Sequence, residues 1–352
     1  MKASKIKSSK FFSWHFIVIG FVLACAIGAR LSRLCAKELS KTDFALGTLC
    51  TIRLLEGGNS ATLAEAFARL RTIEDRMSVN KEGTEVSKIN KMSGKEAVQV
   101  SSDTFYVISK AIEYAKLTNG AFDPSIGPLV KLWNIGESGE KVPSSKDILA
   151  AKALVDWQDV VLDASTNKVF LRKQGMRLDL GAIAKGYAAD EVEKILQLAR
   201  VKAAAIDLGG NVLVYGTKKD KTSWRVGIQN PESERGDYLG IVEGPQMTVV
   251  TSGVYERYFI ENGKWYHHIM DTKTGFPVDN GLMSVSIVSK SSIDADALST
   301  SLFALGIEQG MELLKRFPDA YAIFIDKEKK VYLSPGAEKV FTLIDKSYTL
   351  VR

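Results

Sequence analysis

Two oxygen-bearing side chains near the C-terminal end of the chain have the spacing of ligands on one face of a helix. Apolar spacing predicts a helix over residues 293–305, from which Asp296 and Thr300 project one turn apart. A carboxylate and a hydroxyl suit a hard cation such as Mg²⁺, which binds one or two carboxylates together with waters and phosphate. Aspartate is also common in the first turn of a helix, and the spacing alone favours that simpler interpretation.

Histidine is the side chain best suited to acid–base chemistry near neutral pH, and the chain contains three histidines. His15 lies in an apolar N-terminal stretch, which leaves the adjacent pair His267 and His268. Neighbours on a strand point to opposite faces, so at most one of the pair enters a given pocket. Zinc is disfavoured because no cysteine or further histidine supplies the missing ligands. A general base needs no such companions, although a histidine on a strand is more often structural.

Three glycine-containing segments combine turns with charged groups. Residues 120–129 contain Asp123 between residues that stiffen or turn the chain. Residues 178–190 read as a strand that leads through glycine into a helix starting near Lys185, where free backbone groups suit phosphate. Residues 206–211 predict a tight turn between two strands. Each segment is also compatible with an ordinary turn, and neither a Walker loop nor a dinucleotide-binding glycine motif in a strand–turn–helix context is present.

The elements that must position these groups follow from hydrophobic periodicity. Amphipathic spacing predicts helices over residues 61–77, 103–118, 184–198, 293–305 and 308–316. Residues 44–55 read as one strand, and from Asp159 onward short β-rich segments alternate with turns, as in antiparallel hairpins. The predicted fold class is α+β, with helices packed on antiparallel sheets. Without repeats or long linkers, residues 39–352 are expected to form one catalytic domain.

The positive charge of the chain is confined to its N-terminus. The formal net charge is +6, and residues 1–38 contain seven lysines or arginines and one glutamate, so the remainder is neutral. A neutral body disfavours nucleic acid as a partner. Residues 11–29 are almost wholly apolar, and we expect an export signal or membrane anchor that places the body on the extracytoplasmic side of the inner membrane. Cleavage, retention and lipid attachment at Cys25 remain alternatives.

Cysteine usage excludes a disulfide framework for the body. The cysteines are Cys25, Cys35 and Cys50, and only Cys50 lies in the predicted globular part. Its place on a predicted strand favours a small core residue over a nucleophile.

Taken together, the segments resemble the ApbE family of FAD:protein FMN transferases. The resemblance extends from about residue 44 to residue 350 and follows the order of segments in the family. The segments that carry it are residues 122–128, 178–190, 207–211, 251–253, 268–275 and 296–300.

The resemblance implies an activity and a set of site residues. FAD would lie between two halves of the body with Mg²⁺ at its pyrophosphate, and a threonine or serine hydroxyl of a target protein would attack the FMN phosphorus and release AMP. The implied metal ligands are the carbonyl of Ala182 with Asp296 and Thr300, and the implied base is His268. The implied flavin-nucleotide contacts are Leu46, Met77, Ser78, Asp123, Lys185 and Met270.

Other functions of the same site remain open at this stage. Water in place of the hydroxyl would make the protein an FAD pyrophosphatase that yields FMN and AMP, and loss of turnover would leave an exported flavin-binding protein. The resemblance suggests as acceptors the flavinylated subunits of the sodium-translocating NADH:quinone reductase or of the related Rnf complex.

Overall fold

The computed structural model describes residues 38–234 and 236–351. The predicted export signal or membrane anchor falls on residues 1–38 and so lies, apart from Glu38, outside the described residues. Within the described ranges, no helix has the length and apolar character needed to cross a membrane.

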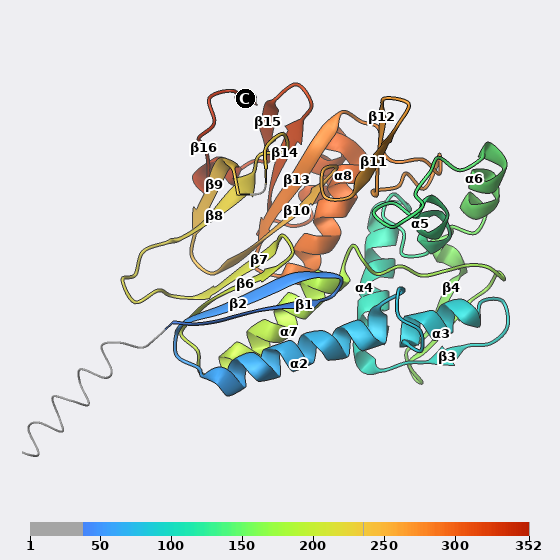
Figure 1. Ribbon diagram of the computed structural model, residues 1–352, viewed down its shortest axis with the longest axis horizontal. Coiled ribbons are helices and arrows are strands. Elements are labelled where there is room, and N and C mark those ends of the chain that lie inside the picture. Colours follow the sequence, from blue (N-terminus) through green and yellow to red (C-terminus); the bar gives the residue numbers. More distant parts are fainter. Residues whose placement is uncertain (1–37, 235, 352) are drawn as a thin grey trace, which may run out of the picture.

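A nine-stranded sheet forms the centre of the structure (Figure 1). Neighbouring strands pair antiparallel, except for the last pair, β15 and β17, which is parallel. In spatial order the strands are β1 (Leu39–Ala45), β2 (Thr48–Glu56), β6 (Ala203–Leu208), β7 (Asn211–Gly216), β10 (Met247–Gly253), β13 (Leu282–Ser289), β14 (Tyr321–Asp326), β15 (Lys330–Leu333) and β17 (Thr349–Val351). The central strands β13 and β14 are buried over most of their length because both faces of the sheet are covered.

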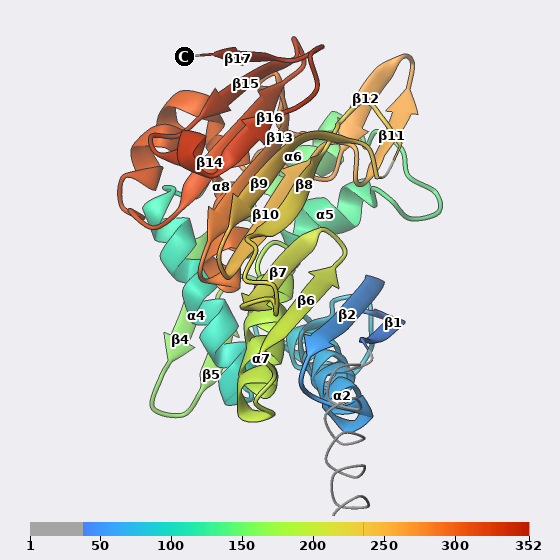
Figure 2. The same ribbon diagram turned by 90° about the vertical axis from the view of Figure 1, so that its left-hand side faces the viewer.

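One face of the sheet is covered by three long helices (Figures 1 and 2). These are α2 (Ser60–Met77), α7 (Ala184–Leu198) and α8 (Ser292–Leu314). In α2 the buried apolar residues recur every three or four positions, so one face of the helix enters the core. Helix α4 (Ser102–Leu117) packs against α8 and α2.

The opposite face of the central sheet carries a small three-stranded sheet. It consists of β8 (Trp224–Gln229), β9 (Tyr238–Gly244) and β16 (Phe341–Leu343). Its inward side chains, among them Ile228 and Val242, pack on Val249 and Ile323 of the central sheet in a second apolar core. The central sheet is therefore held between a helical layer and a β layer.

Shorter elements surround the far end of the helical layer. They are α3 (Glu85–Lys91), α5 (Gly127–Trp133), α6 (Ser145–Lys152), the 3-10 helix η1 (Trp157–Asp159), the sheet of β3 (Val98–Gln99), β4 (Val160–Asp163) and β5 (Lys168–Leu171), and the hairpin of β11 (Tyr258–Glu261) and β12 (Lys264–His267); the 3-10 helix η2 (Ala337–Lys339) lies elsewhere, beside β14 and β16. Of this group, α5, α6 and the β11–β12 hairpin share a third apolar cluster around Trp133.

The α+β class and most of the predicted elements are confirmed. Helix α7 has the predicted bounds, and α2 and α4 begin after the side-chain caps Asn59 and Ser101. The two helices predicted over residues 293–305 and 308–316 form one element, α8, which is broken by Gly306 with φ 78° and ψ −179°. Cys50 is fully buried in the core, as predicted, and burial raises the pKa of its thiol to about 11.

Two predicted strands are wrong. Residues 44–55 form parts of two strands, β1 and β2, joined by a turn at Leu46 and Gly47 with φ values of 54° and 70°. Residues 178–180 are extended but do not form a strand, because the backbone of Leu178 bonds to the side chain of Asn90 instead of to a neighbouring strand.

Candidate active site

A single cleft with a volume of 1060 Å³ collects the chemically interesting segments. Its walls come from the β1–β2 turn, the end of α2, the loop before α5, the turn before α7, the β6–β7 turn, β10, the loop after β12 and one face of α8. This volume is at the upper end of the range for small-molecule sites and suits a ligand as large as a dinucleotide.

All ten residues singled out from the sequence line this cleft. They are Leu46, Met77, Ser78, Asp123, Ala182, Lys185, His268, Met270, Asp296 and Thr300. They come from positions spread over most of the described chain, so only the folded structure brings them together. Their individual roles stay predictions.

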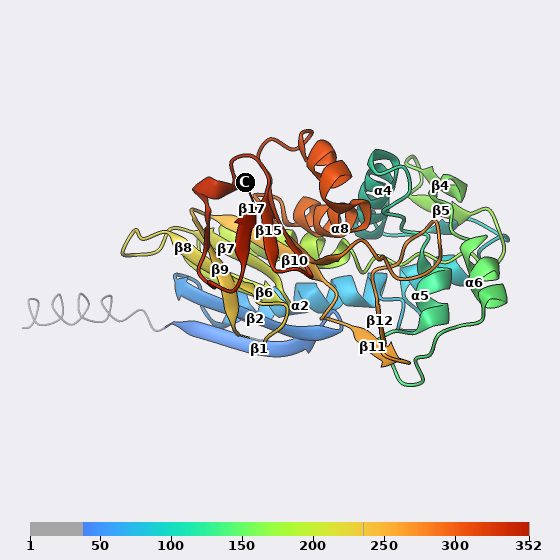
Figure 3. The same ribbon diagram turned by 90° about the horizontal axis from the view of Figure 1, so that it is seen from above.

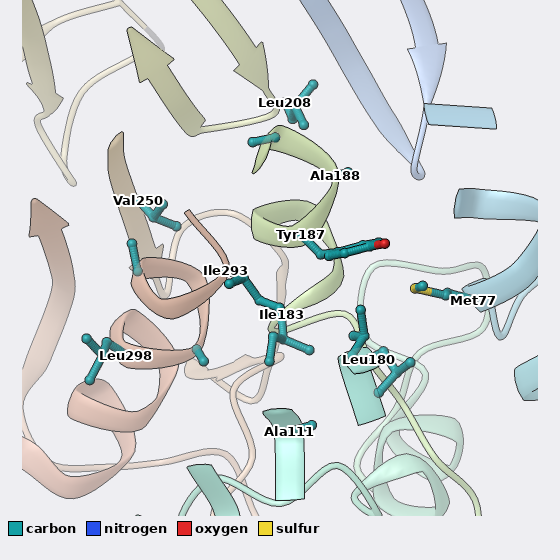
Figure 4. Packing of buried hydrophobic residues seen from close by; sticks show 14 of the residues in the cluster. Met77, Ala111, Leu180, Ile183, Tyr187, Ala188, Leu208, Val250, Ile293 and Leu298 are labelled. Carbon is teal, nitrogen blue, oxygen red and sulfur yellow. The ribbon is translucent and has the colours of Figure 1, made fainter. Parts of the chain in front are cut away.

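The turn before α7 is fixed by apolar packing on both sides. Figure 4 shows Leu180 and Ile183, which flank this turn, pointing into the core beside Tyr187 of α7 and Ile293 of α8. Ile183 is fully buried. With its neighbours anchored in this way, Ala182 is held at the cleft surface.

The three predicted metal ligands lie where α7 and α8 meet. A carboxylate oxygen of Asp296, Oδ2, accepts a hydrogen bond of 2.8 Å from the backbone N–H of Gly186. This N–H belongs to the first turn of α7, where backbone N–H groups have no partner within the helix, so the carboxylate caps it. Ala182 precedes the N-cap Ile183, so its carbonyl does not belong to the helix. One turn along α8, the hydroxyl of Thr300 lies 3.1 Å from that of Ser252.

This set of donors fits a hard divalent cation. It offers one buried carboxylate, one backbone carbonyl and one hydroxyl, all oxygen, and it leaves room for phosphate and water in the cleft. Burial raises the pKa of Asp296, and the positive charge of Lys185 opposes that rise. Among the described residues, no three or more histidine, cysteine or acidic side chains come together in a group that could hold a metal ion.

His268, the predicted base, lines the cleft and bonds to the backbone through one ring nitrogen. Its Nδ1 lies 3.2 Å from the backbone carbonyl of Arg257, and because a carbonyl only accepts, Nδ1 carries the proton. The Nε2 lone pair is therefore available for proton transfer. Burial lowers the pKa of His268 to about 4, so the ring is neutral at neutral pH.

His267 has a structural role, in agreement with the expected opposite orientation of the pair. Its Nε2–H donates to the carbonyl of Val278 at 2.8 Å, and its Nδ1 accepts from the N–H of Ile269. The buried ring meets Phe303 edge-on. Both nitrogens are thus used within the fold.

Comparisons with known proteins agree with this arrangement. Residues 46–325 match the model of the ApbE family. The chain belongs to the ApbE family. It is 40% identical to an FAD:protein FMN transferase of Klebsiella pneumoniae, over 83% of this chain and 91% of the relative, and 35% identical to one of Treponema pallidum, over 96% and 98%. The crystal structure of an ApbE protein of Thermotoga maritima superposes with a TM-score of 0.79 at 31% identity, covering 86% of this chain and 99% of that one.

Family membership makes the chain an enzyme of the transferase class. The match covers every residue that lines the cleft except Phe44. The cleft is therefore the part of this ApbE family member in which its activity is expected.

Asp123 lies at the cleft wall but is occupied by internal hydrogen bonds. Its Oδ1 accepts from the N–H and the hydroxyl of Ser125, and its Oδ2 accepts from the N–H of Trp157 at 3.0 Å. Burial raises the pKa of Asp123 to about 6, although these hydrogen bonds act to lower it. Its main structural effect is to hold the loop before α5 in shape, and the predicted ligand contact would have to share these oxygens.

Arg177, Asp179 and Arg257 are among the charged cleft residues that are not in the set predicted from the sequence. Asp179 accepts from the N–H of Gly181 and so shapes the turn that presents Ala182. Arg177, Arg257 and Lys185 all moderate the rise in the pKa of Asp179 that burial causes, so three cations surround it. The local sequence around the two arginines does not indicate that they belong to the site, because only the fold brings them into the same cleft as Lys185.

Close approach of α7 and α8 at Gly186 predicts a large effect of a small substitution. A Cβ at Gly186 would lie 2.2 Å from the carbonyl oxygen of Ser292 and 2.7 Å from Cβ of Asp296. We expect Gly186→Ala to lower the free energy of unfolding by about 1–3 kcal/mol, because the helices must separate. Denaturant titration measures this change. The control Gly244→Ala places its Cβ only against the flexible sulfur of Met247, at 3.3 Å, and should leave stability nearly unchanged.

The lowered pKa of His268 predicts a specific pH dependence. The imidazole C2 proton resonance should titrate with a midpoint of about 4 in the folded protein, against 6.5 for an unperturbed histidine. Between these values the unfolded chain binds a proton that the folded chain does not, so this group reduces stability as the pH falls from 6.5 to 4. His268→Gln should remove this part of the loss, and equal slopes for the two proteins would contradict the assignment.

Proposed function

We propose that this protein is a Mg²⁺-dependent FAD:protein FMN transferase that attaches FMN to a threonine or serine hydroxyl of a target protein and releases AMP. The observation that carries the proposal is the shared cleft, in which His268 faces the same space as Ala182, Asp296 and Thr300. The relatives named FAD:protein FMN transferase support the choice of substrate.

The reaction has a simple balance of bonds. The acceptor oxygen forms a bond to the FMN phosphorus, the bond from this phosphorus to the bridging oxygen of the pyrophosphate breaks, and AMP leaves with that oxygen. The acceptor hydroxyl loses its proton to Nε2 of His268, which the carbonyl of Arg257 holds in the required tautomer. A neutral ring can accept that proton, and a protonated ring cannot.

Basic side chains that line the cleft also supply positive charge. Lys185 bonds through its Nζ to the carbonyl of Gly181 and so stays near the turn of Ala182. Arg177 and Arg257 line the same space and, with Lys185, can hold the diphosphate by charge-assisted hydrogen bonds. When bound at Ala182, Asp296 and Thr300, Mg²⁺ would neutralise charge that develops on the phosphate oxygens.

The proposal extends to the place of action and the acceptor. The lysine-rich, apolar N-terminus supports an enzyme tethered at the inner membrane with its body on the extracytoplasmic side. A flavinylated redox subunit of the sodium-translocating NADH:quinone reductase or of the Rnf complex would then be within reach.

One experiment separates this proposal from its alternatives. The full-length protein is incubated with FAD, MgCl₂ and such a redox subunit, and AMP and protein-bound flavin fluorescence are followed together. Equal amounts of AMP and bound flavin are expected. AMP with free FMN would indicate a pyrophosphatase, and bound FAD without AMP would indicate a flavin-binding protein.

A further inference from the structure

The hairpin of β11 and β12 exposes an unusual group of apolar side chains. Tyr258, Ile260 and Trp265 are 39%, 55% and 43% exposed. Tyr258 and Trp265 stack with ring centroids 4.3 Å apart and planes inclined by 5°. We call these three residues the hairpin patch. Aromatic side chains held in one place offer contact area at a low cost in conformational entropy.

The other face of the hairpin is anchored to the body. Phe259 and Tyr266 stack on each other, and Tyr266 lies 5.5 Å from Trp133 of α5, measured between ring centroids. Figure 3 shows the hairpin projecting from the body beside α5. The hairpin patch therefore points to solvent from a fixed support.

The base of this hairpin is part of the active-site cleft. Arg257 immediately precedes β11 and His268 immediately follows β12, and the N–H of His268 donates to the carbonyl of Arg257. Both residues line the cleft, and Tyr258 pairs in register with His267. Tyr258, the first residue of the hairpin patch, is thus paired with the residue that directly precedes His268, the proposed base.

A second exposed apolar pair lies on another rim of the same cleft. Phe44 and Leu49 face each other across the β1–β2 hairpin and are 64% and 61% exposed. Phe44 itself lines the cleft, next to the turn at Leu46 and Gly47. We call these two residues the rim pair.

We propose that the hairpin patch and the rim pair form the docking surface for the acceptor protein. This inference rests on the proposed function, which requires a protein hydroxyl to reach His268. A specific interface covers about 800 Å² on each partner, whereas a four-residue strand extends only about 13 Å from its base. An acceptor seated over His268 therefore covers the hairpin patch. Tyrosine and tryptophan are the side chains that most often dominate such interfaces, and they favour an acceptor with apolar side chains close to its threonine or serine.

Two hairpin variants test this inference. Trp265→Ser removes the larger ring, and Ile260→Arg adds a charge while it leaves the stacked pair intact. With the redox subunit as acceptor, we expect each variant to raise KM for the acceptor about tenfold or more and to keep kcat and the affinity for FAD. Leu198→Arg is the matched control, since Leu198 is 83% exposed at the end of α7 and does not line the cleft. It should leave KM unchanged.

Each outcome decides the question. Unchanged KM in both hairpin variants, with melting curves like that of the wild type, would overturn the docking surface. Two further results would also overturn it if KM for the acceptor stayed unchanged. If the hairpin variants no longer bound anionic phospholipid vesicles, a membrane would be the occupant of the surface. If they no longer self-associated in sedimentation, a second copy of the chain would be the occupant. If the wild type forms AMP but no protein-bound flavin, the proposed transfer fails, and this inference falls with it.

Discussion

Replacement of His268 by alanine should abolish transfer while FAD still binds. We expect the rate of flavin transfer at saturating FAD to fall about 10²–10⁴-fold, the usual contribution of a positioned general base. The reason lies in the geometry: Nδ1 is committed to the carbonyl of Arg257, so Nε2 is the nitrogen that can take the proton of the acceptor. Rapid-quench measurement of AMP, together with fluorescence titration of FAD, separates the chemical step from binding.

The neighbouring histidine provides the matched control. His267→Gln can keep a donor near the carbonyl of Val278, but it disturbs a buried ring that packs on Phe303. We expect this variant to melt at a lower temperature and to transfer flavin at a rate close to that of the wild type. A rate for His268→Ala within a few-fold of the wild type would show that another group, or water, accepts the proton.

The parts of the fold that could be predicted are those with a local physical signal. Helix α7 shows its bounds through apolar spacing, and the β6–β7 turn through its glycines. Asp296 and Thr300 could be placed on one face of α8 for the same reason, since helix geometry alone determines it. These local signals predict where side chains lie along each element, whereas the predicted roles of the site residues follow from the resemblance to the ApbE family.

The parts that could not be predicted depend on tertiary contacts. Leu46 adopts a left-handed backbone conformation that leucine rarely takes, so Gly47 is the one local signal for the turn between β1 and β2. The sequence around Leu178 predicts a strand, but the backbone of Leu178 bonds to the side chain of Asn90 in α3, 88 residues earlier, and such a partner has no local signal. Arg257 orients His268 through its backbone carbonyl oxygen. Every residue type has this atom, so the sequence gives no sign of the interaction.

Replacement of Asp296 by asparagine should remove the response of the enzyme to Mg²⁺. Asparagine keeps the size of the side chain and an oxygen that can accept from the N–H of Gly186, but it lacks the one buried negative charge of the predicted metal site. We expect the transfer rate at a fixed MgCl₂ concentration to fall at least ~100-fold, because several kcal/mol of charge stabilisation depend on the cation. Binding of Mg²⁺, measured by calorimetry without FAD, should weaken in parallel.

Asp190→Asn is the matched control, because Asp190 also contacts α8, the helix of Asp296, but is not a predicted metal ligand. Its carboxylate oxygens accept from the N–H groups of Ser292 and Ile293 at the start of the same helix, and it does not line the cleft. Asp190→Asn should therefore lower the melting temperature through a weakened cap and leave the dependence of transfer on Mg²⁺ intact. Only a ligand changes the affinity for the ion directly. If both variants showed the same dependence of transfer on Mg²⁺ as the wild type, the role of Asp296 would therefore be structural.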